Sequence, residues 1–132
     1  MNLIDLTVDS ATDFTPPRAE LASDALVVLQ VYAGLRSVWM LSNEQLNLMA
    51  GLPESPRFDP HAIHEMEVST RADALNRMVG VLDVASRVRE LFGEKELSWL
   101  HQRNPAPEMG NRRPLEVLFE KDGAQTLLKH LS

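Results

Sequence analysis

The chain contains no cysteine, and this absence removes several kinds of chemistry at once. Disulfide bonds, zinc ribbons, iron–sulfur clusters and thiol nucleophiles all need the sulfur of that residue. A metal ion would therefore have to be held by His, Asp or Glu side chains. Because the composition fits a reducing compartment and the first residues lack the basic segment of a secretory signal, we expect a cytoplasmic protein.

Basic residues are scarce in the first half of the chain. Residues 1–70 contain three basic and ten acidic side chains, whereas residues 71–132 contain ten basic and nine acidic ones. The net charge of −6 therefore lies almost wholly in the first half, which disfavours a general electrostatic grip on nucleic-acid phosphates there. Long apolar runs are missing too. None approaches the roughly 20 residues of a membrane span, so no membrane contact is expected.

What the chain does contain is apolar residues at helical spacing. They recur every three or four positions over residues 17–39 and again over residues 70–92, which predicts two long amphipathic helices. We expect Thr70 to be the N-cap of the second helix and Gly93 to end it. The predicted buried stripe of that helix consists of Leu75, Met78, Val79, Leu82, Ala85, Val88, Leu91 and Phe92.

Shorter helices are predicted between these two and after them. Ser42 and Gln45 are spaced as a capping box, and they precede a helix that ends near Gly51, a residue suited to the left-handed conformation. The other short helices are expected over residues 61–67, from about residue 94 to Asn104, from Pro114 to Asp122, and from Gly123 to the last residues.

This pattern predicts an all-α protein, a small helical bundle whose 132 residues fit a single domain. Ile4, Leu6 and Val8 alternate with polar residues, which allows either a short strand or a flexible segment at the start. We expect three regions: an arm over residues 1–15, a helical region over residues 16–68, and a C-terminal cluster of short helices over residues 69–132.

Residues with catalytic or metal-binding potential are few. His61, His64 and Glu65 lie within reach of one helical face, a spacing that can hold a divalent cation, but no third ligand is implied elsewhere. A small metal-dependent enzyme is therefore the least favoured alternative. The chain has no Gly-x-Ser-x-Gly elbow and no glycine-rich phosphate loop. A small acidic chain of this kind is typical of a binding module, and we expect no catalysis, no metal site and no cofactor.

An ordered set of residues in the last third resembles a known family. The set comprises Trp99, Leu100, Asn104, Pro105, Gly110, Pro114, Leu115, Leu118 and Gly123. A Trp-Leu helix, an Asn-Pro loop ending in glycine and a Pro-Leu-x-x-Leu helix, in this order, resemble the toxin-binding domain shared by antitoxins of the Xre/MbcA/ParS type. Because the resemblance covers about residues 70–132, we interpret residues 69–132 as a toxin-binding domain.

The resemblance implies a type II antitoxin, a subunit that is not itself an enzyme. Its C-terminal domain would bind and neutralise an NAD-consuming toxin of the RES or ParT-like kind, so the cognate toxin is the expected partner. Residues 16–68 would then form a degenerate helix-turn-helix region. Residues 56–60 hold two prolines where a recognition helix would fall, which argues against direct reading of DNA. A DNA-binding regulator of its own operon is the alternative function.

The toxin contacts are expected near the C-terminal end. Arg112 and Arg113 precede Pro114 and are placed either to grip an anionic group near a helix N-terminus or to form a solvated basic corner. The hypothesised toxin interface consists of Met109, exposed in its loop, with Arg112, Arg113, Lys129 and His130. Trp99 is expected to anchor the core. Through its N-terminal half the protein is expected to form a homo-oligomer.

Overall fold

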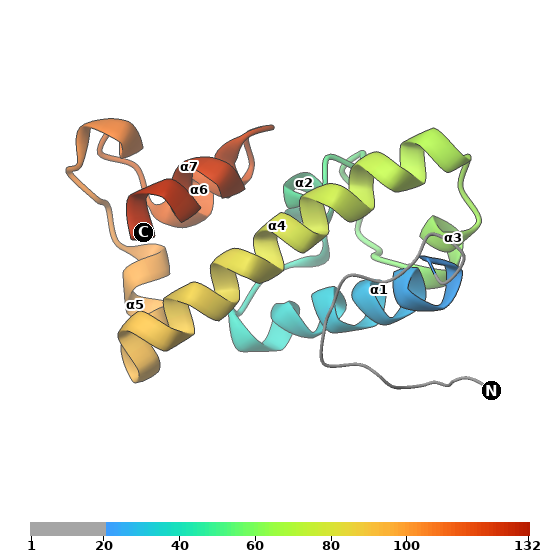
Figure 1. The fold of residues 1–132 in the computed structure, drawn as a ribbon, viewed down its shortest axis with the longest axis horizontal. Helices are drawn as coiled ribbons and strands as arrows, with labels where there is room; N and C mark the ends of the chain where they lie inside the picture. The colour runs from blue at the N-terminus through green and yellow to red at the C-terminus, as the bar shows by residue number, and fades with distance from the viewer. Residues whose placement is uncertain (1–20) are drawn as a thin grey trace.

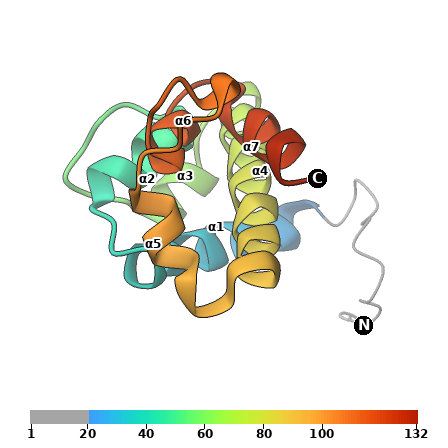
Figure 2. The same ribbon diagram turned by 90° about the vertical axis from the view of Figure 1, so that its left-hand side faces the viewer.

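Helix α4 (Val68–Phe92) is the longest helix and runs through the middle of the protein (Figure 1). The computed structural model describes residues 21–132, so the arm predicted for residues 1–15 and the start of the helix predicted from residue 17 lie outside the described residues. Helix α1 (Leu21–Val38) and helix α7 (Gly123–Leu131) both pack against α4. Figure 2 shows them on different sides of it.

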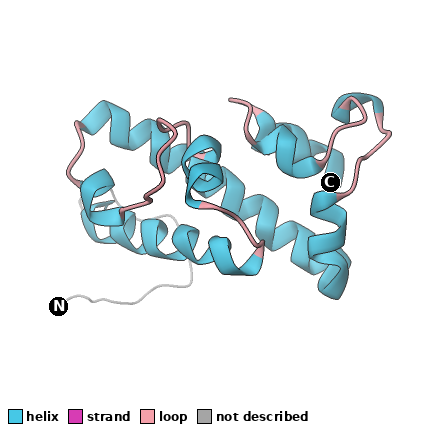
Figure 3. Ribbon diagram, turned by 180° about the vertical axis from the view of Figure 1, so that it is seen from behind, coloured by secondary structure: helices cyan, strands magenta, loops and turns pink. Residues whose placement is uncertain are grey.

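The remaining helices are short. They are α2 (Asn43–Met49), α3 (Pro60–His64), α5 (Glu96–His101) and α6 (Pro114–Leu118), with single 3₁₀ turns η2 (Gly93–Lys95) and η3 (Pro107–Met109). Within the described residues there is no strand, and the one extended pairing is an isolated bridge between Asn104 and Arg112 (Figure 3). The predicted all-α fold is confirmed for this part of the chain.

One continuous apolar core receives side chains from all seven α-helices described between residues 21 and 132. Its fully buried members include Leu29, Tyr32, Trp39, Leu46, Met49, Met78, Leu100, Leu115, Leu118 and Leu127. The Tyr32 hydroxyl donates a hydrogen bond to the Leu46 carbonyl over 2.6 Å, which ties α1 to α2. Burial raises the pKa of the Tyr32 phenol, so the hydroxyl keeps its proton and remains a donor at neutral pH.

The two predicted ends of α2 are confirmed. The Gln45 N–H donates to the Ser42 hydroxyl over 3.1 Å, and the Ser42 N–H donates to the Gln45 side chain over 2.8 Å, which is the reciprocal arrangement of a capping box. Gly51 follows the helix with a φ of 75°, a left-handed conformation in which a side chain is strained. The local sequence therefore determines both limits of this helix.

The predicted N-cap of α4 is wrong. The helix begins at Val68 after Glu67, and Thr70 lies inside its first turn. The Ser69 and Thr70 hydroxyls donate to the Glu67 carboxylate over 2.6 and 3.3 Å instead of accepting from the helix backbone. These hydrogen bonds lower the pKa of Glu67, and its negative charge is favourable beside the positive end of the helix dipole. The Glu67 carboxylate thus accepts a hydrogen bond from the Thr70 hydroxyl that was expected to cap the helix.

The buried face of α4 also differs from the predicted stripe. Three of the predicted residues are buried: Met78, Ala85 and Val88. The others are half-buried or exposed: Leu75, Val79, Leu82, Leu91 and Phe92. The rest of the buried face is formed by Ala74, Gly80, Val81 and Val84. A Cβ at Gly80 would lie 3.1 Å from the Cβ of Ala124, so α7 packs closely on α4 at this position. The buried face is therefore set by where α1 and α7 pack on α4, which the spacing of apolar residues along α4 does not reveal.

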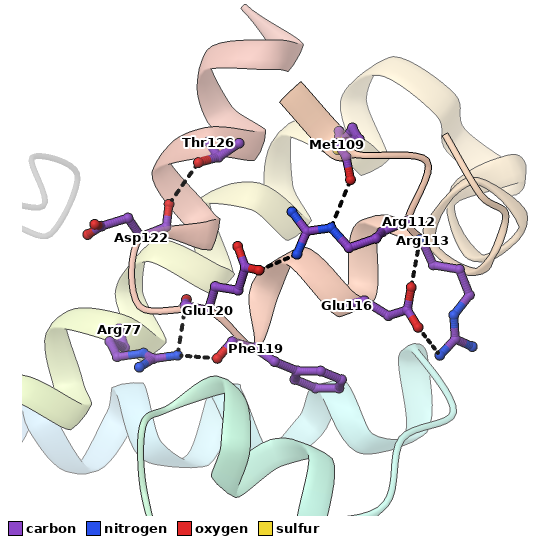
Figure 4. A network of polar contacts seen from close by, with 9 residues as sticks. All are labelled: Arg77, Met109, Arg112, Arg113, Glu116, Phe119, Glu120, Asp122 and Thr126. Atoms are coloured by element: carbon purple, nitrogen blue, oxygen red, sulfur yellow. Dashed lines mark hydrogen bonds and ion pairs between the residues drawn. The ribbon is translucent and has the colours of Figure 1, made fainter. Parts of the chain in front are cut away.

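Arg77, in the first half of α4, holds the C-terminal ends of two short helices. Its Nε donates to the Met49 carbonyl at the end of α2 over 3.0 Å. Its Nη2 donates to the Phe119 and Glu120 carbonyls after α6 over 3.2 and 3.3 Å (Figure 4). The last carbonyls of a helix have no partner within the helix, and a nearby cation is favourable for them. Arg77 thus connects the chain before α4 with the chain after it.

We predict that Arg77→Met lowers the free energy of unfolding by about 2–3 kcal/mol, because hydrogen bonds from a charged donor to several helix-end carbonyls are lost. Urea denaturation followed by circular dichroism measures this loss. Arg87→Met on the same helix is the control, since Arg87 pairs with the exposed Glu90, which contributes about 0–1 kcal/mol, and reaches a single helix-end carbonyl, that of Leu131, at 3.5 Å. Equal losses in the two variants would contradict the role assigned to Arg77.

Candidate binding surface

Helix α5 returns the chain onto the end of α4. Leu100 is fully buried in the core, and the half-buried Trp99 ring stacks on Phe92 with ring centroids 5.2 Å apart and an interplanar angle of 21°. An aromatic pair of this kind contributes about 0.5–1.5 kcal/mol beyond the area that it buries. Trp99 therefore holds α5 against α4 while part of its side chain stays accessible.

The loop between α5 and α6 is shaped by its own hydrogen bonds. The Asn104 N–H donates to the Arg112 carbonyl over 3.0 Å, and the Asn104 Oδ1 accepts the Ala106 N–H over 2.9 Å. Pro105 between them is exposed. Gly110 ends η3 with a φ of 64°, a left-handed conformation that favours glycine. Asn104 thus holds the start of this loop through its two hydrogen bonds, and Gly110 provides the turn after η3.

The expectation that Met109 is exposed is wrong. Its side chain is fully buried and belongs to the apolar core. The physical reason is η3, because a helical turn at Pro107–Met109 directs this side chain inward where an open loop would leave it in solvent. The Met109 carbonyl accepts a hydrogen bond from Arg112 Nε over 2.9 Å. Met109 therefore supports the loop from inside and is unavailable for direct contact with a toxin.

The turn from α6 to α7 is closely packed. Pro114, Leu115 and Leu118 of α6 are buried. Gly123 begins α7, and a Cβ at this position would lie 1.7 Å from the Val117 carbonyl oxygen. No side chain fits there without a shift of the backbone. Gly123 thus starts a helix that packs on the preceding one, which is a role that the glycine's place after Asp122 did not reveal.

The two arginines that were expected to act together point in different directions (Figure 4). Arg112 forms an ion pair with Glu120, in addition to its bond to the Met109 carbonyl. Arg113 Nη2 lies 3.3 Å from Glu116 Oε2, and the same carboxylate accepts the Arg113 N–H over 3.0 Å at the start of α6. The structure therefore does not bring these guanidinium groups into one basic grip. Each is paired with an acidic side chain nearby.

Lys129 and His130 lie at the end of α7. His130 Nδ1 pairs with Glu108 of η3, and a hollow is lined by these two residues with Thr126 and Lys129. Lys129 is exposed and has no ion-pair partner among residues 21–132. The hydrogen bond from His130 lowers the pKa of Glu108, which keeps this carboxylate charged at neutral pH. Of the five residues predicted for the interface, Lys129 is the one that offers an exposed, unpaired charge within the described part.

A buried carboxylate forms a connection that sequence reasoning missed. Glu96, at the start of α5, is 8% exposed. Its Oε2 accepts a hydrogen bond from Trp39 Nε1 over 2.7 Å, and its Oε1 accepts one from Arg89 Nε over 3.2 Å. Trp39 lies 57 residues earlier in the chain, so no local pattern marks the pair. Glu96 therefore joins α5 to the ends of α1 and α4, and only the structure reveals these contacts.

The histidines considered for a metal site lie on α3. His61 is exposed and His64 is half-buried, with its Nδ1 buried and without a hydrogen-bond partner. In the described part of the chain, no group of three or more His, Asp or Glu side chains is close enough to hold a metal ion. The fold of residues 21–132 thus places no third ligand beside these two histidines.

A cavity of about 500 Å³ lies beside Arg77. Its lining includes apolar residues such as Met49 and charged residues of both signs, among them Asp73, Lys121 and Asp122. The Arg77 guanidinium is already occupied by helix-end carbonyls. The cavity therefore presents no convergent charge for an anionic or cationic ligand.

No family model matches this chain, and no curated protein and no solved structure matches it either. None of the helices between residues 21 and 132 has the length and apolar character needed to cross a membrane. The chemistry of the candidate surface is therefore argued from its own residues.

We predict that Gly123→Ala lowers the free energy of unfolding by about 3 kcal/mol, because the new methyl group overlaps the Val117 carbonyl and forces α6 and α7 apart. Thermal or urea unfolding measures the change. Gly34→Ala in α1 is the matched control, since no atom lies within 4 Å of a Cβ built there. The control is expected to gain up to about 1 kcal/mol from helix propensity. A neutral Gly123→Ala would contradict the close packing described for the turn.

We predict that His130→Ala raises the pKa of Glu108 toward the ordinary value of about 4.3. In the folded wild type this pKa is lowered, chiefly by the hydrogen bond with His130, so the pair stabilises the fold above the unfolded-state pKa. Its contribution is lost as the pH falls through the folded-state pKa. Carboxylate titration by NMR measures the shift. Glu116, whose pKa is lowered chiefly by the Arg113 N–H, is the internal control and is expected to stay unchanged.

Proposed function

We propose that this chain is the antitoxin of a type II toxin–antitoxin pair, and that it binds and neutralises an NAD-consuming toxin of the RES or ParT-like kind. The observation that carries the proposal is that the residues of the family resemblance fall in one packed unit. Leu100, Leu115 and Leu118 fill its core. Gly110 takes a left-handed conformation, and Gly123 lies where no side chain fits. Residue types that meet such specific demands are stronger support than their order alone.

The proposed toxin-facing surface is the end of the protein at which α4 and α7 finish. Arg87 Nη2 lies 3.5 Å from the Leu131 carbonyl, so the end of α7 lies beside the second half of α4. Lys129 is exposed on α7, and Leu91 is 47% exposed on α4. Phe92 and Trp99 add a partly accessible aromatic pair at the same end of α4. An exposed apolar group with charges around it is the composition of a protein-binding surface.

One side-chain pair on this surface leaves it able to rearrange. His130 of α7 pairs with Glu108, whose side chain is 46% exposed, whereas Arg112 pairs with Glu120 in the turn before α7, beside Arg77. Exposed pairs contribute about 0–1 kcal/mol, so an acidic group of a partner can replace Glu108 at small cost. Lys129 has no acidic partner among residues 21–132, so its charge can meet an acidic group of a partner without displacing another residue. Basic residues therefore still contribute to the proposed interface, with Lys129 first.

Neutralisation requires only that the chain cover the toxin's NAD site. In this proposal the toxin is the enzyme and supplies the catalytic groups, while the antitoxin contributes shape and charge. The test uses a RES or ParT-like toxin encoded beside the gene for this chain. Co-expression is expected to restore growth and the cellular NAD level, and purified toxin and chain are expected to elute as one complex.

We predict that Leu91→Asp weakens this complex by about tenfold or more and that Lys129→Glu weakens it by about three- to tenfold at low salt, because the first removes an apolar contact and the second a steering charge. Isothermal titration calorimetry measures both dissociation constants. Val68→Asp and Lys121→Glu are the matched controls, since Val68 is an exposed apolar residue at the other end of α4 and Lys121 is an exposed lysine in the turn before α7.

Three outcomes contradict the proposal in different ways. Failure of the wild-type chain to bind or neutralise the toxin removes the antitoxin function. Full binding by Leu91→Asp and Lys129→Glu keeps the function but moves the interface elsewhere. Equal weakening in the two control variants would show that binding follows overall charge or stability and does not depend on this end of the protein.

A further inference from the structure

Methionine carries all the sulfur of this chain, because there is no cysteine. Five of the six methionines lie between residues 21 and 132, and their side chains differ widely in exposure. Met49, Met78 and Met109 are fully buried, and Met66 is half-buried. Met40 is 73% exposed. Among these five residues, one thioether is therefore open to reagents in solvent, and the core shields the others wholly or in part.

The backbone holds the Met40 side chain in this exposed position. Met40 follows α1 with a φ of 56°, and the Leu41 N–H donates to the Arg36 carbonyl over 2.8 Å. This hydrogen bond closes a helix end around one left-handed residue. Trp39 before Met40 is fully buried, and Leu41 after it is buried as well. Because both neighbours are anchored in the core, Met40 would have to displace one of them to turn inward.

The left-handed position does not favour methionine on grounds of stability. Glycine is the usual residue there, since a Cβ is strained in this conformation. Asn111 is the other non-glycine residue with a positive φ between residues 21 and 132, and asparagine tolerates this conformation better than methionine does. Strained backbone positions are common at functional sites. The Met40 side chain thus lowers stability, and what it adds to the surface is an accessible thioether.

We propose that Met40 is a site of reversible oxidation to methionine sulfoxide by hydrogen peroxide. The thioether sulfur attacks one peroxide oxygen, so that an S–O bond forms and the O–O bond breaks. The sulfur is oxidised by two electrons and the peroxide is reduced. The proton on the transferred oxygen passes to the leaving hydroxide, which becomes water. Methionine sulfoxide reductases reverse this modification.

The contacts around Met40 allow the oxidised chain to stay folded. Trp39 Nε1 donates to Glu96, and His101 Nε2 lies 3.2 Å from the Trp39 carbonyl. These contacts join the end of α1 to α5, and neither of them uses the Met40 side chain. A sulfoxide in the core would place a polar group among apolar ones, whereas a sulfoxide at Met40 remains hydrated. Oxidation at this site therefore changes the polarity of the surface and leaves the packing intact.

Peroxide treatment of the folded full chain, followed by mass spectrometry of its proteolytic peptides, tests the proposal. Met40 is expected to gain one oxygen about tenfold or more faster than Met49, Met78 and Met109, because core methionines react only when the fold opens. Met66 is expected to react at an intermediate rate. Incubation with the two sulfoxide reductases, one for each sulfoxide epimer, is expected to restore the original mass of the Met40 peptide.

Two variants separate the sulfur of Met40 from its backbone conformation. Met40→Leu keeps an apolar side chain and is expected to remove the fast reaction at this position, with the rates at the four other methionines unchanged. Met40→Gly is expected to raise the urea midpoint, because glycine relieves the left-handed strain. Asn111→Gly is the matched control and is expected to raise the midpoint less. Oxidised wild type is expected to keep its helical circular dichroism and its urea midpoint.

Several results would overturn the proposal. A core methionine that reacts as fast as Met40 would show that exposure does not select the site. Reaction of Met40 only in urea would show that its sulfur is covered in the folded chain. A lower midpoint for Met40→Gly, or unfolding once Met40 alone is oxidised, would show that this side chain supports the fold. None of these measurements involves a toxin, so their outcome is independent of the proposed function.

Discussion

The guanidinium of Arg77 is the contact on which the arrangement of the short helices depends. Helices α2 and α6 have seven and five residues, and isolated helices shorter than about 12–15 residues are marginal in water. Their ends must therefore be held by tertiary contacts. From one planar group, Arg77 donates hydrogen bonds to the Met49 carbonyl at the end of α2 and to the Phe119 carbonyl after α6. A lysine ammonium is a compact charge without this fork of donors, so the geometry demands arginine.

The buried pair of Trp39 and Glu96 adds a second connection between the two halves of the chain. A carboxylate taken out of water is costly unless its oxygens are hydrogen-bonded, and here both oxygens accept bonds, one from Trp39 and one from Arg89. Together with Arg77, this pair makes α4 a shared support for the helices before and after it. The N-terminal and C-terminal regions are consequently parts of one packed structure around that helix.

Local chemistry made α2 and the all-α class predictable, whereas contacts between distant residues were not predictable. Ser42 and Gln45 form a capping box within four residues, and Gly51 takes the left-handed conformation that glycine favours. The buried face of α4 depends on how closely α7 approaches Gly80, and the burial of Met109 depends on a turn that no periodicity marks. In the candidate site the sequence supplied the basic residues but not their acidic partners, because pairing is a property of the fold.

The internal pairing of these basic residues changes how a partner would be recognised. An unpaired basic cluster attracts any acidic surface, whereas Arg112 and His130 become available only to a partner whose own acidic groups can replace Glu120 and Glu108 in place. Each exchange is nearly neutral in free energy, so selectivity comes from geometry and not from total charge. In the proposed interface, an apolar contact at the exposed Leu91 would then have to provide most of the affinity. Such an interface would discriminate by shape first and would use its charges to reject partners that do not fit.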